Sequence, residues 1–105
     1  PEKLYLVMEF VDGCELLDHI RRNGRLLEHE ARYVFLQLAL GLRYIHSKGV
    51  VHRDLKPQNI LVDREASRPD LLEVKISDFG HSKLVNDGYD TARTQVGTPR
   101  FWAPE

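Results

Sequence analysis

The clearest hydrophobic pattern in this chain of 105 residues lies between Glu28 and Ser47. Apolar side chains recur there every three or four positions, which is the spacing of one face of an α-helix. They form two stripes, so we expect a helix over Glu28–Ser47 that is covered on more than one side and ends near Gly49. The first stripe comprises Ala31, Val34, Phe35, Leu38, Leu42 and Ile45, and the second comprises Tyr33, Leu36, Leu40 and Tyr44.

Short apolar runs predict the strands of the fold. Leu4–Phe10 is apolar and is bounded by charged residues and then by Gly13, which predicts a buried strand followed by a turn. The β-branched residues of Val50–Val51 and Asn59–Val62 predict two small strands. Leu72–Ile76 alternates between apolar and polar residues, which predicts a strand that pairs with Asn59–Val62 as a hairpin.

The remaining segments predict one more helix and two irregular stretches. A short helix is expected over Glu15–Arg22, closed by Asn23 and Gly24. Asp63–Asp70 is polar and contains a proline, so we expect an exposed turn. Residues 81–100 lose all periodicity, which is typical of a functional loop. Helices and a hairpin in this order indicate an α+β fold.

Composition narrows the class of protein. The formal net charge of −1 argues against a nucleic acid or an anionic membrane as the main partner. No apolar run approaches the ~18 residues that a membrane span needs. Cys14 is the one cysteine, so an internal disulfide partner is excluded and a reducing compartment is expected, which we take to be the cytoplasm or the nucleus.

Chemistry is concentrated in His52–Asn59, which reads H-R-D-L-K-P-Q-N. A carboxylate, an ammonium group and a carboxamide lie within six positions there, and Pro57 restrains the backbone among them. Two further motifs follow in order, Asp78-Phe79-Gly80 and Ala103-Pro104-Glu105. Together these motifs resemble the catalytic region of eukaryotic protein kinases, and Lys56, two residues after Asp54, resembles the serine/threonine branch. The stretches 81–83 and 12–16 are similar to the calmodulin-dependent and checkpoint-kinase group.

This resemblance implies phosphoryl transfer from ATP to protein substrates, with Mg²⁺ as the metal. Transfer depends mainly on positioning and on charge neutralisation. The resemblance makes Asp54 the acceptor of the hydroxyl proton and Lys56 the cation that offsets growing charge. It makes Asn59 and Asp78 the ligands of Mg²⁺, which prefers hard oxygen atoms.

The resemblance also assigns residues to the nucleotide. Met8 becomes the gatekeeper beside the adenine, the backbone from Glu9 to Val11 becomes the hinge that binds the adenine edge, and Leu61 becomes the apolar floor. Two interpretations of Glu15 stay open. It either lies near the ribose and a substrate arginine, or it stabilises the positive end of the following helix.

Between the second and third motifs the chain resembles an activation segment. Phosphorylation adds about −1.5 to −2 charge and strong acceptor oxygens. We expect an upstream activating kinase to phosphorylate Thr94, whose phosphate then bridges Arg53 and Lys83. Thr98 is expected near Asp54 and Lys56, where it shapes the substrate site.

The resemblance covers essentially all of residues 1–105 but only part of a kinase domain. It implies a partial kinase-like fold: the hinge strand plus the N-terminal half of the mainly helical large lobe, from the hinge to the Ala-Pro-Glu motif. The small lobe and the C-terminal helices are missing from this window, so we expect the 105 residues alone to be inactive. Three interpretations stay open: a segment of an active kinase, a pseudokinase-type binding module, or a truncated interaction module.

Overall fold

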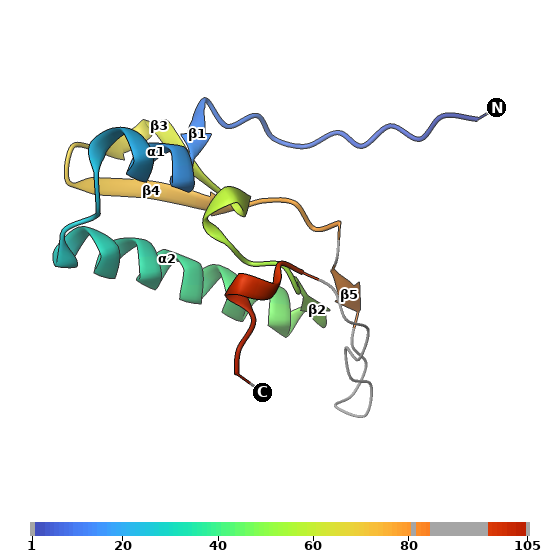
Figure 1. The fold of residues 1–105 in the computed structure, drawn as a ribbon. Coiled ribbons are helices and arrows are strands. Elements are labelled where there is room, and N and C mark those ends of the chain that lie inside the picture. The colour runs from blue at the N-terminus through green and yellow to red at the C-terminus, as the bar shows by residue number, and fades with distance from the viewer. Residues whose placement is uncertain (1, 81, 85–96, 105) are drawn as a thin grey trace.

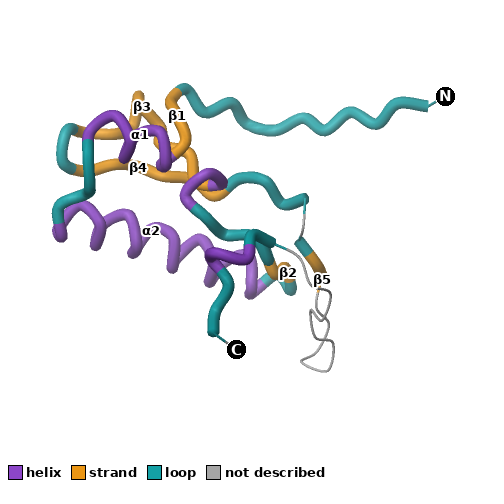
Figure 2. The backbone as a smooth tube through the Cα atoms, viewed as in Figure 1, coloured by secondary structure: helices purple, strands orange, loops and turns teal. Residues whose placement is uncertain are grey.

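The computed structural model describes residues 2–80, 82–84 and 97–104. Its centre is a three-stranded antiparallel sheet in the order β1-β3-β4, with two helices packed against it (Figure 1). A separate pair of short strands, β2 and β5, lies near the other end of the long helix (Figure 2). The elements are β1 (Gly13–Glu15), α1 (Leu16–Asn23), α2 (Glu28–Ser47), β2 (Val50–Val51), a 3-10 helix (Pro57–Asn59), β3 (Ile60–Arg68), β4 (Leu71–Ile76), β5 (Lys83–Leu84) and a second 3-10 helix (Pro99–Phe101).

Helix α2 spans the residues that the apolar pattern predicts. Its start lacks a serine or threonine cap. The carboxylate of Glu30 supplies the other half of a capping box by accepting a hydrogen bond from the Leu27 backbone N–H at 3.2 Å. The first stripe is covered only in part, because Val34 is buried whereas Phe35 of the same stripe is 72% exposed. Tyr44 of the second stripe is 64% exposed. The expected coverage on more than one side is therefore wrong for the described residues.

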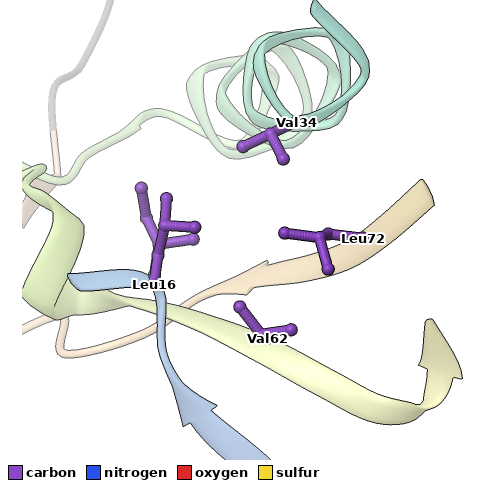
Figure 3. Close-up of a cluster of buried hydrophobic side chains, with 5 residues drawn as sticks. Leu16, Val34, Val62 and Leu72 are labelled. Atoms are coloured by element: carbon purple, nitrogen blue, oxygen red, sulfur yellow. The ribbon is translucent and has the colours of Figure 1, made fainter. Parts of the chain in front are cut away.

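The core forms where both helices meet one face of the sheet. Strand pairing places alternate residues of β3 and β4 on the same face, so their apolar side chains point toward the helices. Figure 3 shows Val34 of α2 facing Leu72 and Val62, with Leu16 of α1 beside them. Burying such aliphatic side chains contributes about 1.5–3 kcal/mol each. The five buried apolar residues of this core are Leu16, Val34, Ile60, Val62 and Leu72.

The predicted hairpin is confirmed, but its turn is shorter than expected. Residues 63–68 belong to β3, so the predicted exposed turn over Asp63–Asp70 is wrong except at its tip. The pairing is irregular between Asp63 and Arg68, and side chains replace the missing ladder bonds. Asp63 Oδ1 accepts from the N–H groups of Glu65 and Ala66, and Ser67 Oγ accepts from the Glu73 N–H at 2.8 Å. Polar residues thus extend a strand whose outer side faces water.

The predicted buried strand over Leu4–Phe10 is wrong. These residues have no regular secondary structure, and Leu4 is 98% and Phe10 88% exposed. An apolar strand becomes buried only when a neighbouring strand and a facing layer receive it. No strand among the described residues pairs with this segment, which runs away from the sheet in Figure 1.

Gly13 also differs from its prediction, because it lies in β1 rather than in a turn. It pairs with Asp63 of β3, and a Cβ atom there would lie 1.7 Å from the Val62 carbonyl oxygen. Only glycine allows the two backbones to come this close. Helix α1 begins and ends one residue later than predicted and is closed by Gly24 at φ 82°. Neither helix of the described residues has the length and apolarity of a membrane span.

Candidate active site

The polar loop His52–Asn59 is held in place by a histidine that the sequence analysis did not single out. His52 is the most deeply buried side chain among the described residues, at 2% exposed. Its Nδ1 accepts a hydrogen bond from the Asp54 backbone N–H at 3.1 Å, so a neutral ring carries its proton on Nε2. That Nε2 lies 2.8 Å from the Ser77 carbonyl oxygen and donates to it. The signal in the sequence is a histidine directly after the apolar pair Val50–Val51.

The backbone around Asp54 is tightly determined. Arg53 adopts φ 71°, in the left-handed region that a non-glycine residue rarely occupies. Asp54 is 8% exposed, and the carboxamide of Asn59 donates to its backbone oxygen at 2.7 Å. The same Nδ2 lies 3.4 Å from Asp54 Oδ2. The 3-10 helix Pro57–Asn59 brings Asn59 back to Asp54, because the Asn59 N–H closes a turn onto Lys56.

The side chains of Lys56 and Thr98 meet at the Asp54 carboxylate. Lys56 Nζ donates to Thr98 Oγ1 at 2.6 Å, and that hydroxyl donates to Asp54 Oδ1 at 3.1 Å. Lys56 Nζ also lies 3.6 Å from Asp54 Oδ2. Thr98 comes from a segment more than 40 positions away in the chain, and the structure places it beside both residues. A carboxylate, a cation and a hydroxyl are thereby held in one small triangle.

Asp78 joins this site through Ser77. The Ser77 N–H and Oγ both donate to the Asn59 carbonyl oxygen, at 2.8 and 3.1 Å. Asp78 follows at φ 55°, and its Oδ1 accepts from the Gly80 N–H at 3.2 Å. The rings of Phe79 and the buried His52 make an edge-to-face contact with their centroids 4.9 Å apart, but Phe79 stays 41% exposed. The two predicted metal ligands, Asn59 and Asp78, thus lie on segments joined by direct hydrogen bonds.

The donor set suits Mg²⁺ bound together with phosphates. The side-chain nitrogen of Asn59 donates a hydrogen bond to Asp54, so the side-chain oxygen is the atom that would bind a metal ion. A carboxamide and a carboxylate oxygen are hard ligands, and Mg²⁺ usually takes one or two protein oxygens plus phosphates and water. Among the described residues no group of three or more His, Cys, Asp or Glu forms a complete metal cage.

A cavity of about 260 Å³ lies beside Asp78 and brings together five of the predicted site residues. It is slightly smaller than the ~300 Å³ lower limit of typical ligand pockets, so it suits an aromatic base better than a whole nucleotide. Lys75, which the sequence analysis passed over, also lines it and donates to Glu9 Oε2 at 3.0 Å. The five predicted residues are Met8, Glu9, Val11, Leu61 and Asp78.

Glu15 stands apart from this cavity. It is half-buried at the end of β1, its backbone partner is Leu61 of β3, and it directly precedes α1. Its side chain makes no capping hydrogen bond to that helix. Both interpretations of Glu15 therefore stay open, since a carboxylate at a helix start is favourable even without a direct bond.

The expected regulatory residues are described only in part. Lys83 lies in β5 and pairs with Val51 of β2, two residues before Arg53. Thr94 lies outside the described residues. The irregular segment predicted over 81–100 contains this short strand, which its polar composition conceals.

Gly97 brings the distal end of that segment against the polar loop His52–Asn59. It adopts φ 101°, and a Cβ atom there would lie 2.7 Å from the Arg53 carbonyl oxygen. The indole nitrogen of Trp102 would lie 3.0 Å from the same Cβ atom. The absence of a side chain at Gly97 therefore lets this segment approach the loop closely enough to bring Thr98 to Asp54.

Comparison with known proteins gives matches along the whole chain. The sequence model of the protein kinase domain matches residues 1–105. The chain is 50% identical over 103 residues to CBL-interacting serine/threonine-protein kinase 8 of Arabidopsis thaliana, covering 98% of this chain and 22% of that protein. It is 43% identical over 105 residues to SNF1-related protein kinase catalytic subunit alpha KIN12 of the same plant, covering 100% of this chain and 20% of that protein. The chain thus spans about a fifth of the relatives it matches.

Proposed function

Because the chain belongs to the protein kinase domain family, we propose that its parent protein transfers the γ-phosphoryl group of ATP to serine or threonine hydroxyls of protein substrates. The predicted serine/threonine kinase resemblance is confirmed by the family match and by the named relatives. The observation that supports activity is the triangle of Asp54, Lys56 and Thr98, in which the base, the cation and a hydroxyl lie within hydrogen-bond or ion-pair reach.

Asp54 is the proposed acceptor of the substrate hydroxyl proton. Its carboxylate accepts from Thr98 on one oxygen, while its backbone is fixed by His52 and Asn59. This fixation holds the carboxylate in one orientation without reorganisation during the reaction. Lys56 stays close enough to offset negative charge that grows on the transferred group.

Asn59 and Asp78 are the proposed ligands of Mg²⁺, which neutralises phosphate charge when bound. We further propose that Met8, Glu9, Val11 and Leu61 contact the adenine side of ATP, because these residues share one cavity with Asp78. Glu15 is a candidate contact for the ribose or for a substrate arginine.

We also propose control by phosphorylation of Thr94 by an upstream kinase. A phosphate accepts charge-assisted hydrogen bonds from cations. Arg53 and Lys83 are the proposed donors, and the pairing of β2 with β5 supports this by holding their two segments together. In the full-length protein, activation by such a kinase is expected to vanish in Thr94→Ala and in Arg53→Ala. Full activation of Thr94→Ala would remove Thr94 as the switch.

The test of the main proposal compares Asp54→Asn with Asp78→Asn in the full-length protein. Asp54→Asn removes the proton acceptor, so peptide phosphorylation falls by roughly 10²–10⁴-fold while magnesium-dependent ATP binding is kept. Asp78→Asn removes a metal ligand, so both turnover and ATP binding fall. Turnover is measured by phosphate transfer to a serine peptide and binding by calorimetry.

Asp70→Asn is the matched control, because Asp70 is exposed at the hairpin tip, away from the site residues. It should leave both quantities unchanged. A wild-type protein that binds ATP but transfers no phosphate would identify a non-catalytic binding module and contradict the proposal.

A further inference from the structure

Strand β4 has two edges, and a glutamine of α2 occupies the one that faces the helix. β4 pairs with β3 along its other edge. Gln37 Nε2 donates to the Leu72 carbonyl oxygen at 2.7 Å, and Gln37 Oε1 accepts from the Val74 N–H at 2.9 Å. One carboxamide thus offers the donor and the acceptor that a neighbouring strand would offer.

These two bonds determine where β4 lies along its own axis. Each needs a specific backbone group of β4, so a slip of the strand breaks both. Gln37 Nε2 also lies 3.3 Å from the Tyr33 carbonyl oxygen, one turn earlier in α2, which ties the carboxamide to the helix. A buried backbone group that loses its partner costs about 1–3 kcal/mol, so the register is strongly preferred.

The position of β4 carries through to Asp78. Val74 is four residues before Asp78, about 13 Å of extended chain. Ser77 binds the Asn59 carbonyl oxygen through two donors, and its own carbonyl accepts from His52. From the residues that Gln37 binds, β4 therefore runs directly into Ser77, which joins the segments of the two proposed metal ligands.

We propose that Gln37 is a positioning residue for magnesium binding: by fixing β4 it sets Asp78 against Asn59. This rests on the proposed function and adds to it a residue of helix α2, which carries none of the proposed site residues. Partners that orient metal ligands commonly change metal affinity by 10–100-fold when they are removed. Gln37 acts two segments away from the metal, so the effect should lie near the lower end of that range.

Tyr33 supplies a matched comparison on the same helix. Its hydroxyl donates to Glu73 Oε1 at 2.5 Å, and this bond raises the pKa of Tyr33 above its ordinary value. The contact joins two side chains and leaves the backbone groups of β4 untouched. Tyr33→Phe therefore removes a bond between α2 and β4 without releasing the register that Gln37 holds.

The experiment uses the full-length protein with Gln37→Leu, Gln37→Glu and Tyr33→Phe. Gln37→Leu removes both bonds to β4. Gln37→Glu keeps the acceptor for Val74, but its second carboxylate oxygen cannot donate and is repelled by the Leu72 carbonyl oxygen. The magnesium concentration that half-saturates ATP binding is measured by calorimetry, and that for turnover is measured by peptide phosphorylation. Gln37→Leu should raise both by roughly tenfold, with turnover regained at high magnesium.

Gln37→Glu should also raise both, because it sets an acceptor against the Leu72 carbonyl oxygen, and Tyr33→Phe should raise neither. Amide exchange at Val74 should quicken in Gln37→Leu and not in Tyr33→Phe. If Gln37→Leu does not fold, Gln37→Glu carries the same comparison. An unchanged magnesium dependence in a folded Gln37 variant, or an equal shift in Tyr33→Phe, overturns the proposal. Because ATP binding is measured separately, a wild type without turnover contradicts the proposed function and leaves this test intact.

Discussion

The polar loop His52–Asn59 and the N-terminal segment of residues 2–10 differ in polarity and in exposure to solvent. The loop is almost entirely polar, yet His52, Asp54 and Asn59 are buried. The N-terminal segment is apolar at six of its nine positions, yet residues 2–10 are exposed throughout. Burial in this molecule therefore follows the available partners rather than the polarity of the residues.

The difference comes from the range of the interactions. The loop satisfies several of its polar groups within a few residues, as when the Asp54 N–H meets His52 and the Asn59 side chain meets Asp54. His52 also ties the loop to the Ser77 carbonyl oxygen. The N-terminal segment needs a strand edge and a facing layer, and an exposed ion pair between Glu9 and Lys75 ties it to the sheet. Local hydrogen bonds thus order the polar loop, whereas apolar pattern alone does not order the segment.

The strongest way to break this comparison is His52→Phe. A phenyl ring keeps the edge contact with Phe79 but leaves the Asp54 N–H and the Ser77 carbonyl without partners. A buried polar group that loses its hydrogen-bond partner costs about 1–3 kcal/mol, so the free energy of unfolding should fall by that amount for each of the two groups. Chemical denaturation of the full-length protein measures the loss. Amide exchange at Asp54 should quicken as well, and unchanged exchange there would refute the role given to His52.

A smaller effect is expected from Gly97→Ala, which pushes the distal segment away from the loop. The new methyl group meets the Arg53 carbonyl oxygen, and the alanine must adopt the positive φ of Gly97. Together these two effects cost about 1–3 kcal/mol. Because Thr98 follows directly, its bond to Asp54 should weaken and peptide turnover should fall. Gly24→Ala is the control: it also has a positive φ, but nothing lies within 4 Å of its added Cβ atom. Equal losses of turnover in the two variants would show that strain alone, and not contact with the loop, is responsible.

The smallest effect belongs to the N-terminal segment. Glu9→Gln removes the ion pair with Lys75, in which the Glu9 side chain is 68% exposed and the Lys75 side chain is 41% exposed. Exposed pairs contribute about 0.2–1 kcal/mol and are screened by salt, so the change in the free energy of unfolding should be small and should vanish at high ionic strength. Denaturation at two salt concentrations measures it. A larger, salt-independent loss would mean that the segment is packed as the sequence predicted.

The sequence predicts the fold well where one pattern suffices. Helix α2 follows from apolar periodicity alone, and the hairpin follows from two runs whose residues alternate. The errors occur where a distant partner decides. Residues 63–68 extend a strand because Ser67 and Asp63 supply side-chain bonds that no propensity reports. Gly13 lies in β1 because a neighbouring backbone comes too close for a Cβ atom, which appears in the sequence only as a glycine.

For the candidate site, the sequence predicts the chemically reactive groups and not their supports. Asp54, Lys56, Asn59 and Asp78 were proposed from the resemblance of their motifs to those of protein kinases, and the structure joins their segments by direct bonds. His52 and Gln37 were missed, because each acts through backbone groups of residues 25 or more positions away. A glutamine inside an apolar stripe and a histidine after a strand are the weak signals that identify them.

The contact around Gly97 also has a practical consequence. Trp102 is the one tryptophan among these 105 residues, and its indole nitrogen lies in the cluster formed by Gly97 and the Arg53 carbonyl. Indole fluorescence depends on the polarity of its surroundings. Trp102 is 48% exposed, so its emission should shift when this cluster opens or tightens. A protein in which Trp102 emits alone would thereby report, optically and in real time, on the docking of the distal segment against the polar loop.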